Sequence, residues 1–206
     1  MPRRSQEDRS RTTRTALEQA GYRLFAARGY AGVSAEEIVS EAGVTRGALH
    51  HHYGDKRGLF LAVLEQLEAD NTAEIERAVA ALPDPNDLMA AMAVGLRTFL
   101  DMCSRAETVR IAMADGPAVL GWAGWREMES RHGLGLITDL LDRAVAAGLA
   151  VNAPVRVLAH LILSAVTEAG MLVANAEDPE TERAEAEQCI LLMISGLLRP
   201  VAAPEP

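Results

Sequence analysis

The sequence lacks the patterns that mark β-strands and membrane spans. Neither alternating apolar and polar residues nor an Asn-Gly hairpin signal occurs in its 206 residues, which points away from a sheet. The most apolar stretch, residues 155–174, is interrupted by His160, Thr167 and Glu168, so no unbroken run of about 18 apolar residues could cross a bilayer. The N-terminus is charged rather than signal-like, so we expect a cytoplasmic protein with no membrane partner.

Catalytic motifs are also missing. There is no G-x-S-x-G elbow, no phosphate-cradling glycine loop and no pair of metal ligands at helical spacing, so we expect neither an enzyme nor a bound metal or cofactor. The two cysteines, Cys103 and Cys189, lie in apolar helical patterns without companion ligands, and a buried free thiol is expected at each. Apolar residues make up 49 % of the chain, which is enough for a substantial helical core.

Residues 33–60 carry the strongest positive signal. Ser34 followed by Glu37 is a capping-box pattern that opens a short helix. Gly43 ends this helix, because glycine enters the left-handed conformation without a side-chain penalty.

A second helix follows at once. Thr45 caps residues 46–52, and Gly54 closes the helix. Asp55 then caps a long third helix that runs on beyond Leu67. Two short helices joined by a tight turn form a helix-turn-helix, which usually places its second helix in the major groove of DNA.

The second helix has the chemistry of a DNA-reading surface. Arg46 can donate a bidentate pair to guanine, typically worth ~1–3 kcal/mol against a wrong base. Thr45 sits at a helix N-terminus, where its hydroxyl and the neighbouring amides can bind a phosphate. Arg46 shares a helix face with His50, and Gly47 shares one with His51.

The run His50, His51 and His52 also invites a metal-binding interpretation. Consecutive helical residues point about 100° apart, so adjacent histidines do not converge on one ion as a pair one turn apart does. An expression tag is disfavoured, because the run is internal to a patterned helix. A DNA-facing surface is the better interpretation.

Residues 11–67 resemble the N-terminal domain of the tetracycline-repressor (TetR/AcrR) family of bacterial transcription regulators. The resemblance rests on a first helix ending LFAARGY, on GVSAEEIVSEAGVTRGALHHHYGDKRGLF, and on the Tyr53-x-x-Lys56 junction into the next helix. At His50 the sequence departs from the family, whose members often carry a tyrosine there. By position, the resemblance implies contacts to bases from Arg46, Gly47, His50 and His51. It implies contacts to phosphates from Thr45, His52, Tyr53 and Lys56.

Charge is unevenly distributed along the chain, whose formal net charge is −9. Residues 1–58 contain ten Lys and Arg against seven Asp and Glu, a net of +3, and the rest of the chain carries −12. This segregation would direct DNA to one end of the molecule. Five arginines precede or open the first helix: Arg3, Arg4, Arg9, Arg11 and Arg14. We expect them to contact phosphate or the minor groove. For Arg3 and Arg4 the alternative is a disordered solubilising tail.

The last two expected helices, residues 154–175 and 179–198, are apolar on more than one face. Such a helix must be buried on both sides, so we expect one side to pack within the chain and the other against a second copy. A twofold dimer would read a near-palindromic operator. The alternative is that both helices are core helices of a monomer. The expected interface residues are Leu158, Leu161, Ile162, Ala169, Ile190, Ile194 and Leu197.

Residues 88–141 are rich in methionine and tryptophan, which can line an adaptable small-molecule cavity. Together with the resemblance, this composition predicts an effector pocket, although methionine at helical spacing also suits a core. Trp122 and Trp125, three apart on one helix, are the foremost candidates. The full set is Met89, Met92, Phe99, Met102, Arg110, Met113, Trp122, Trp125 and Met128.

The sequence therefore predicts an all-α protein of about nine helices, or ten if residues 116–135 break once more. Residues 1–55 would form the N-terminal arm and helix-turn-helix DNA-binding domain, residues 56–200 an effector-binding and dimerisation domain, and residues 201–206 a disordered tail. The expected function is that of a dimeric, ligand-responsive transcriptional repressor. A helical interaction protein with a degenerate DNA-binding head and an activator on the same scaffold are the alternatives.

Overall fold

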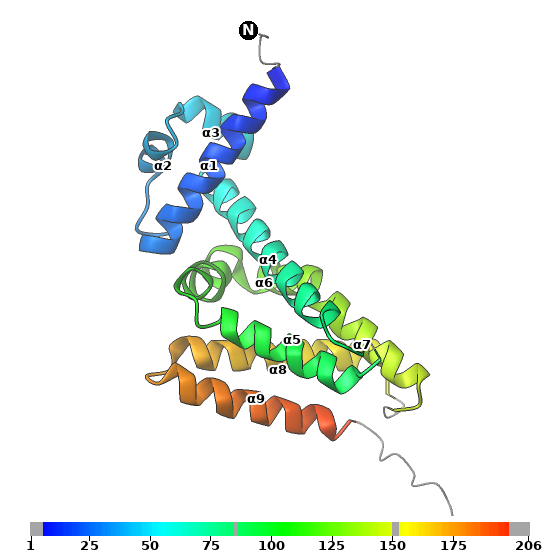
Figure 1. The fold of residues 1–206 in the computed structure, drawn as a ribbon. Coiled ribbons are helices and arrows are strands. Elements are labelled where there is room, and N and C mark those ends of the chain that lie inside the picture. The colour runs from blue at the N-terminus through cyan, green and yellow to red at the C-terminus, as the bar shows by residue number, and fades with distance from the viewer. Residues whose placement is uncertain (1–5, 85, 150–152, 198–206) are drawn as a thin grey trace, which may run out of the picture. The chain divides into compact units, whose positions relative to one another are not determined.

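The computed structural model describes residues 6–84, 86–149 and 153–197, and within these ranges it contains helices and no strand (Figure 1). The all-α prediction is confirmed, with nine α-helices and one π-helix in the described ranges. The helices are α1 (Gln6–Arg28), α2 (Ala35–Glu41), α3 (Arg46–Tyr53), α4 (Lys56–Ala80), α5 (Leu88–Met102), the π-helix η1 (Thr108–Asp115), α6 (Gly116–His132), α7 (Leu134–Ala146), α8 (Val155–Asn175) and α9 (Pro179–Ser195).

Packing divides the chain into two compact units that do not follow its order. The N-terminal unit combines residues 1–68 with residues 106–122, and the C-terminal unit combines residues 69–105 with residues 123–206. The expected boundary after residue 55 therefore falls inside the N-terminal unit, because the first part of α4 packs with the helices that precede it. As a division between DNA-binding and regulatory residues, that boundary stays a prediction.

An aromatic cluster holds the N-terminal unit together. The Phe60 ring meets Phe25 edge-on at 5.3 Å and Tyr30 at 5.1 Å between ring centroids. Phe25 and Phe60 are completely buried, as are Leu17 from α1 and Leu59 from α4. Edge-to-face pairs of this kind add to the burial of apolar area, and they fix α1 against α4.

The local signals expected in residues 33–60 are confirmed. The Ser34 side chain accepts a hydrogen bond from the Glu37 amide, and the Glu37 carboxylate accepts one from the Ser34 amide, which completes the capping box. Gly43 and Gly54 both adopt positive φ, at 66° and 78°. The Asp55 carboxylate accepts the Gly58 amide at 2.8 Å and so caps α4.

The π-helix η1 is an unexpected member of the N-terminal unit, where it packs against α1. Its Asp115 carboxylate accepts the backbone N–H of Tyr30 at 2.6 Å. Gly29, at φ +72°, leaves room for this contact, since a Cβ there would stand 3.1 Å from the Asp115 oxygen and 3.3 Å from Arg110 Cδ. The π-helix η1 runs directly into α6, and the helix is interrupted at Gly121, where φ is 73°.

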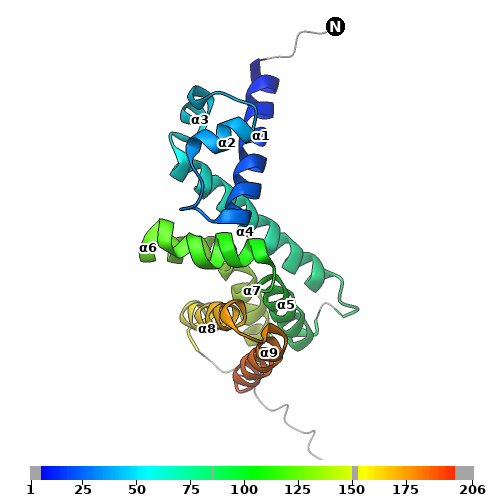
Figure 2. The same cartoon turned by 90° about the vertical axis from the view of Figure 1, so that its left-hand side faces the viewer.

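The C-terminal unit is a bundle in which α8 packs against α5, α7 and α9 (Figure 2). Gly170 of α8 allows a close approach to α5, because a Cβ at that position would lie 2.7 Å from Cys103 Sγ and 2.9 Å from the Phe99 ring. A buried cluster on α5 and α7 contains Leu88, Ala91, Leu140 and Ala144.

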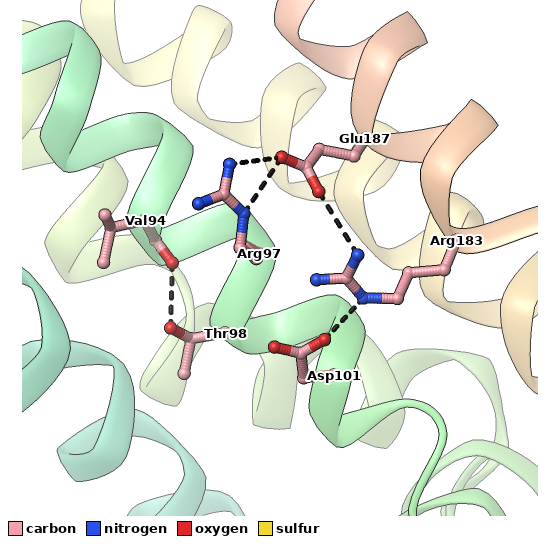
Figure 3. A network of polar contacts seen from close by, with 6 residues as sticks. All are labelled: Val94, Arg97, Thr98, Asp101, Arg183 and Glu187. Carbon is pink, nitrogen blue, oxygen red and sulfur yellow. Dashed lines mark hydrogen bonds and ion pairs between the residues drawn. The ribbon is translucent and has the colours of Figure 1, made fainter. Parts of the chain in front are cut away.

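Ion pairs connect α5 and α9 on the surface of the same unit (Figure 3). Glu187 accepts hydrogen bonds from Arg97 on α5, at 2.8 and 3.1 Å, and from Arg183 one turn back on α9 at 3.4 Å. Arg183 also bonds to Asp101 of α5. The Glu187 side chain is only 15 % exposed, so this network is better shielded from solvent than an isolated surface pair.

Two expectations about α8 and α9 need correction. The helix α8 is long and apolar enough to cross a membrane, with a mean hydropathy of 1.8 over its most apolar window. We expected His160, Thr167 and Glu168 to exclude a span, and they do not. Such a helix is weak evidence of a span, because the core helix of a bundle passes the same test. Cys103 is buried as expected, but Cys189 on α9 is exposed.

Candidate nucleic-acid interface

Helix α3 presents a polar face to solvent and an apolar face to the unit's core. Leu49 is 3 % exposed, whereas Arg46, Gly47, His50 and His51 are all exposed. Thr45 caps the helix by accepting the Ala48 amide at 3.3 Å. The exposed face thus carries the residues expected at base edges, as a helix that enters the major groove requires.

Arg46 is held by a carboxylate that the sequence had not marked. Its guanidinium pairs with Glu36 of α2, while the Arg46 and Glu36 side chains remain 75 % and 62 % exposed. An ion pair this exposed contributes only about 0–1 kcal/mol, so guanine or phosphate could displace Glu36. The pair places Arg46 beside the helix-turn-helix surface before DNA arrives.

His50 makes a specific intramolecular contact. Its Nδ1 lies 2.6 Å from the Gly54 carbonyl oxygen, so Nδ1 must carry a proton and donate it. In the neutral ring Nε2 is then an acceptor. A neutral His50 suits a base amino group, and only the protonated ring could donate from Nε2.

His51 and His52 stand edge to face, with ring centroids 4.9 Å apart. Burial lowers the pKa of His52, and the nearby His51 and Arg14 lower it further because they disfavour a second positive charge. At neutral pH His52 is accordingly uncharged in the free protein. A DNA phosphate would oppose this effect by stabilising the protonated ring.

An open groove of about 1220 Å³ lies between the first half of α1 and α3. It brings together the expected Arg11 and Arg14 with the expected His51 and His52, although they are far apart in sequence. Two carboxylates that had not been anticipated, Glu7 and Glu18, share the groove. The remaining lining residues are Arg9, Ser10, Thr13 and Thr15. Arg3 and Arg4 lie outside the described residues.

Tyr53 is engaged within the protein rather than directed at DNA. Its hydroxyl donates to Glu18 Oε1 at 2.7 Å. Burial and the bond to Glu18 raise the pKa of Tyr53 to about 12, although the nearby Arg14 opposes the rise. The expected phosphate contact would require this proton to leave Glu18.

Lys56 is also occupied inside the N-terminal unit. Its ammonium donates to the carbonyls of Tyr30 at 2.9 Å and Val33 at 2.8 Å. It also stands 4.0 Å from the Tyr30 ring centroid in a cation–π contact. These contacts connect the start of α4 to the loop between α1 and α2 and give Lys56 a structural role, while its phosphate contact stays a prediction.

The expected effector residues are divided between the two units. Arg110, Met113 and Trp122 belong to the N-terminal unit, and the other six belong to the C-terminal unit. Trp122 is 78 % exposed while Trp125 is 8 % exposed, so the two rings have different surroundings. Arg110 lies beside Gly29, and Met92 packs on the α5–α7 cluster. Met102 and Met128 are buried, whereas Met89 and Phe99 are half-buried.

The expected interface residues are divided by burial. Ala169, Ile190 and Ile194 are 4–6 % exposed and serve the core of their own chain, so they are not available to a partner. Leu158, Ile162 and Leu197 are half-buried. The large exposed apolar side chains of α8 and α9 are Val157, Leu161, Leu172, Leu192 and Met193, at 45–73 % exposure.

Comparison with known proteins identifies the family. Residues 89–197 match the model of the tetracyclin repressor-like C-terminal domain, and residues 18–63 match that of the tetR family of bacterial regulatory proteins. A crystal structure of a TetR-family transcriptional regulator from Pectobacterium atrosepticum superposes with a TM-score of 0.82 at 31 % identity, covering 96 % of this chain and 99 % of that one.

Two curated relatives are transcriptional repressors. The repressor AcnR of Corynebacterium efficiens is 28 % identical over 184 residues, which is 85 % of this chain and 88 % of the relative. AcnR of Corynebacterium glutamicum is 35 % identical over 68 residues, and this match spans 33 % of this chain and 36 % of the relative.

The chain belongs to the TetR family. It is a DNA-binding transcriptional regulator with an N-terminal helix-turn-helix and a helical C-terminal domain.

Proposed function

We propose that this regulator represses transcription as a homodimer that binds a near-palindromic operator and is released by a small-molecule effector. The observation that carries the DNA-reading part is the exposed face of α3, where Arg46, Gly47, His50 and His51 lie opposite the buried Leu49. Exposure, a capped N-terminus and small residues near it are what a helix needs to approach base edges.

The dimer is supported by the exposed apolar side chains on α8 and α9. Leu161 is 62 % exposed and Leu192 is 73 % exposed, and neighbouring exposed apolar side chains lie on the same two helices. Several large apolar side chains exposed on two packed helices are typical of an interaction site. A second copy fits it because both helices are long enough to form a four-helix interface, and a twofold pair of reading helices matches a near-palindrome.

The effector is proposed from the family and from the apolar, methionine-bearing helices of the C-terminal unit. A ligand that favours a spacing of the two α3 helices other than the ~34–36 Å between successive major grooves would lower operator affinity. We place this regulator in the bacterial cytoplasm, where its DNA target lies. Repression rather than activation follows the curated relatives, both of which are repressors.

Selection of bound sequences from a random DNA pool, followed by mobility shifts, tests the proposal. We expect a near-palindromic site, and Arg46→Ala should weaken binding to it about 5- to 150-fold, as expected for one lost bidentate base contact. Random DNA should lose far less. Arg77→Ala is the matched control, because Arg77 is an exposed arginine on α4 whose guanidinium bonds only to the backbone one turn before it in the described contacts.

An equal loss on selected and random DNA would remove Arg46 from the base-reading set. Absence of any preferred sequence would favour the second candidate, a helical interaction protein with a degenerate DNA-binding head. A tight ligand that left operator affinity unchanged would overturn the effector part of the proposal.

A further inference from the structure

We propose that His50 is a specificity-determining residue that reads an exocyclic amino group of the operator, adenine N6 or cytosine N4, through the lone pair of Nε2. The inference rests on the proposed DNA interface, and it names the chemical group that one residue of that interface selects. It also gives the Gly54 carbonyl a positioning role, because this oxygen decides which ring nitrogen of His50 carries the proton.

Two reciprocal hydrogen bonds hold His50 at the end of α3. The Gly54 amide donates to the His50 carbonyl at 2.9 Å, and His50 Nδ1 lies 2.6 Å from the Gly54 carbonyl oxygen. Gly54 has a φ of 78°, which residues with a side chain rarely adopt, so this path of the chain depends on glycine. A ring held by the main chain has less rotamer entropy to lose when it binds a base.

The bond to Gly54 fixes where the imidazole proton resides. A carbonyl oxygen is an acceptor only, so Nδ1 must be the donor. A neutral imidazole has one ring proton, and its other nitrogen, Nε2, is therefore an acceptor. The side chain is exposed, and within the described part of the chain Nε2 has no hydrogen-bond partner. Helix α3 thus presents a hydrogen-bond acceptor to solvent at this position.

A bare Nε2 selects among the groups that DNA offers. In the major groove, guanine N7 and O6, adenine N7 and thymine O4 are acceptors, as are the phosphate oxygens, and none of them can donate to Nε2. Adenine N6 and cytosine N4 are donors. Arg46 lies one turn earlier on the same face and supplies donors that suit guanine. The two side chains therefore give α3 one donor and one acceptor for reading bases.

A base-analogue scan of the selected operator tests the proposal at pH 8, above the range in which histidines usually take up a proton. Each adenine is replaced by purine, and each cytosine by pyrimidin-2-one, one position at a time in both half-sites. Either analogue lacks only the amino group. At one position, the loss of affinity should be about three- to tenfold larger per half-site for the parent than for His50→Phe. Comparison within each protein cancels the effect of the analogue on the duplex itself.

Phenylalanine keeps a ring but has neither nitrogen, so His50→Phe isolates the hydrogen bond from the packing of the side chain. His50→Ala should give the same result and covers the case in which the larger ring disturbs α3. The matched control is His51→Ala, because His51 is the next exposed histidine and its ring contacts His52. The full loss at the same base should remain in that variant.

The outcomes separate this inference from the function on which it rests. A random pool that yields no preferred site would overturn the proposed operator reading, and the role of His50 with it. A preferred site at which no amino group couples to His50 would overturn the role of His50 alone.

A protonated His50 on a phosphate gives a different pattern. His50→Phe would then lower the salt slope of binding by about 0.9 per half-site, whereas loss of a neutral acceptor leaves the slope unchanged. A lowered slope would therefore overturn the proposal. Nitrogen-15 NMR of the free protein, with the His50 signals identified by their loss in His50→Phe, should show the proton on Nδ1 and none on Nε2. A proton found on Nε2 would overturn the proposal as well.

Discussion

The two units differ in the side chains that they leave without a partner inside the protein. In the N-terminal unit, polar groups at the candidate interface are already bonded within the protein, as Lys56, Tyr53 and Asp115 illustrate. In the C-terminal unit, α8 and α9 leave large apolar side chains such as Leu161 and Leu192 in solvent. The first unit thus has its polar side chains partnered internally, while the second leaves apolar side chains exposed, which suits the proposed dimer.

The largest effect should come from disturbing the apolar surface. Leu161→Asp or Leu192→Asp would bury a carboxylate without a partner in the proposed interface, at a cost of several kcal/mol. We expect light scattering to show a monomer, and operator affinity to fall at least about 100-fold because the two reading helices no longer bind as a linked pair. Ala73→Asp, an exposed site on α4, is the control. A Leu161→Asp variant that stays dimeric would place the interface elsewhere.

A smaller effect is expected from the internal contacts of the N-terminal unit. Lys56→Met keeps the aliphatic stem but removes two hydrogen bonds and the cation–π contact, so unfolding free energy in urea should fall by about 2–3 kcal/mol. The salt slope of DNA binding should stay unchanged. The neighbouring Arg57→Met serves as the comparison, because Arg57 is exposed and has one long 3.4 Å bond to a carbonyl. Unchanged stability with a smaller salt slope would show instead that Lys56 contacts a DNA phosphate.

The smallest effect should be present near neutral pH and disappear in acid. The Arg28 guanidinium, with the Ser34 amide and hydroxyl, lowers the pKa of Glu37 to about 2. A carboxyl group with a lowered pKa in the folded state stabilises the protein above its ordinary pKa of 4.5, and this contribution is lost as pH falls toward 2. Urea unfolding of Glu37→Gln should therefore show lower stability than the parent at pH 6, and the two curves should converge between pH 5 and pH 2. A difference that stays constant over this range would contradict the assignment.

Local structure in the helix-turn-helix could be predicted because its signals act over a few residues. Ser34 with Glu37, Gly43, Thr45 and Asp55 each set a helix end through contacts within three or four positions, and all of them behave as expected. The set of exposed residues on α3 follows from helical spacing alone.

Roles that depend on contacts between residues far apart in the chain could not be predicted from the sequence in the same way. Lys56 meets carbonyls more than twenty positions earlier, and Asp115 bonds to an amide 85 positions away. On α8 and α9, periodicity revealed two apolar faces but not which face the chain itself covers, and Ala169, Ile190 and Ile194 are buried within the chain. Helical spacing likewise did not reveal that Trp122 is exposed while Trp125, three positions later, is buried.

The two-piece construction of the N-terminal unit has a consequence for recombination between relatives. A single crossover near residue 68 would give a chimera whose α1–α2 loop comes from one parent and whose η1 comes from the other. The Tyr30 amide and the space at Gly29 would then face a foreign residue in place of Asp115. Exchange of DNA-binding specificity between such regulators should therefore succeed more often when residues 106–122 are transferred together with residues 1–68.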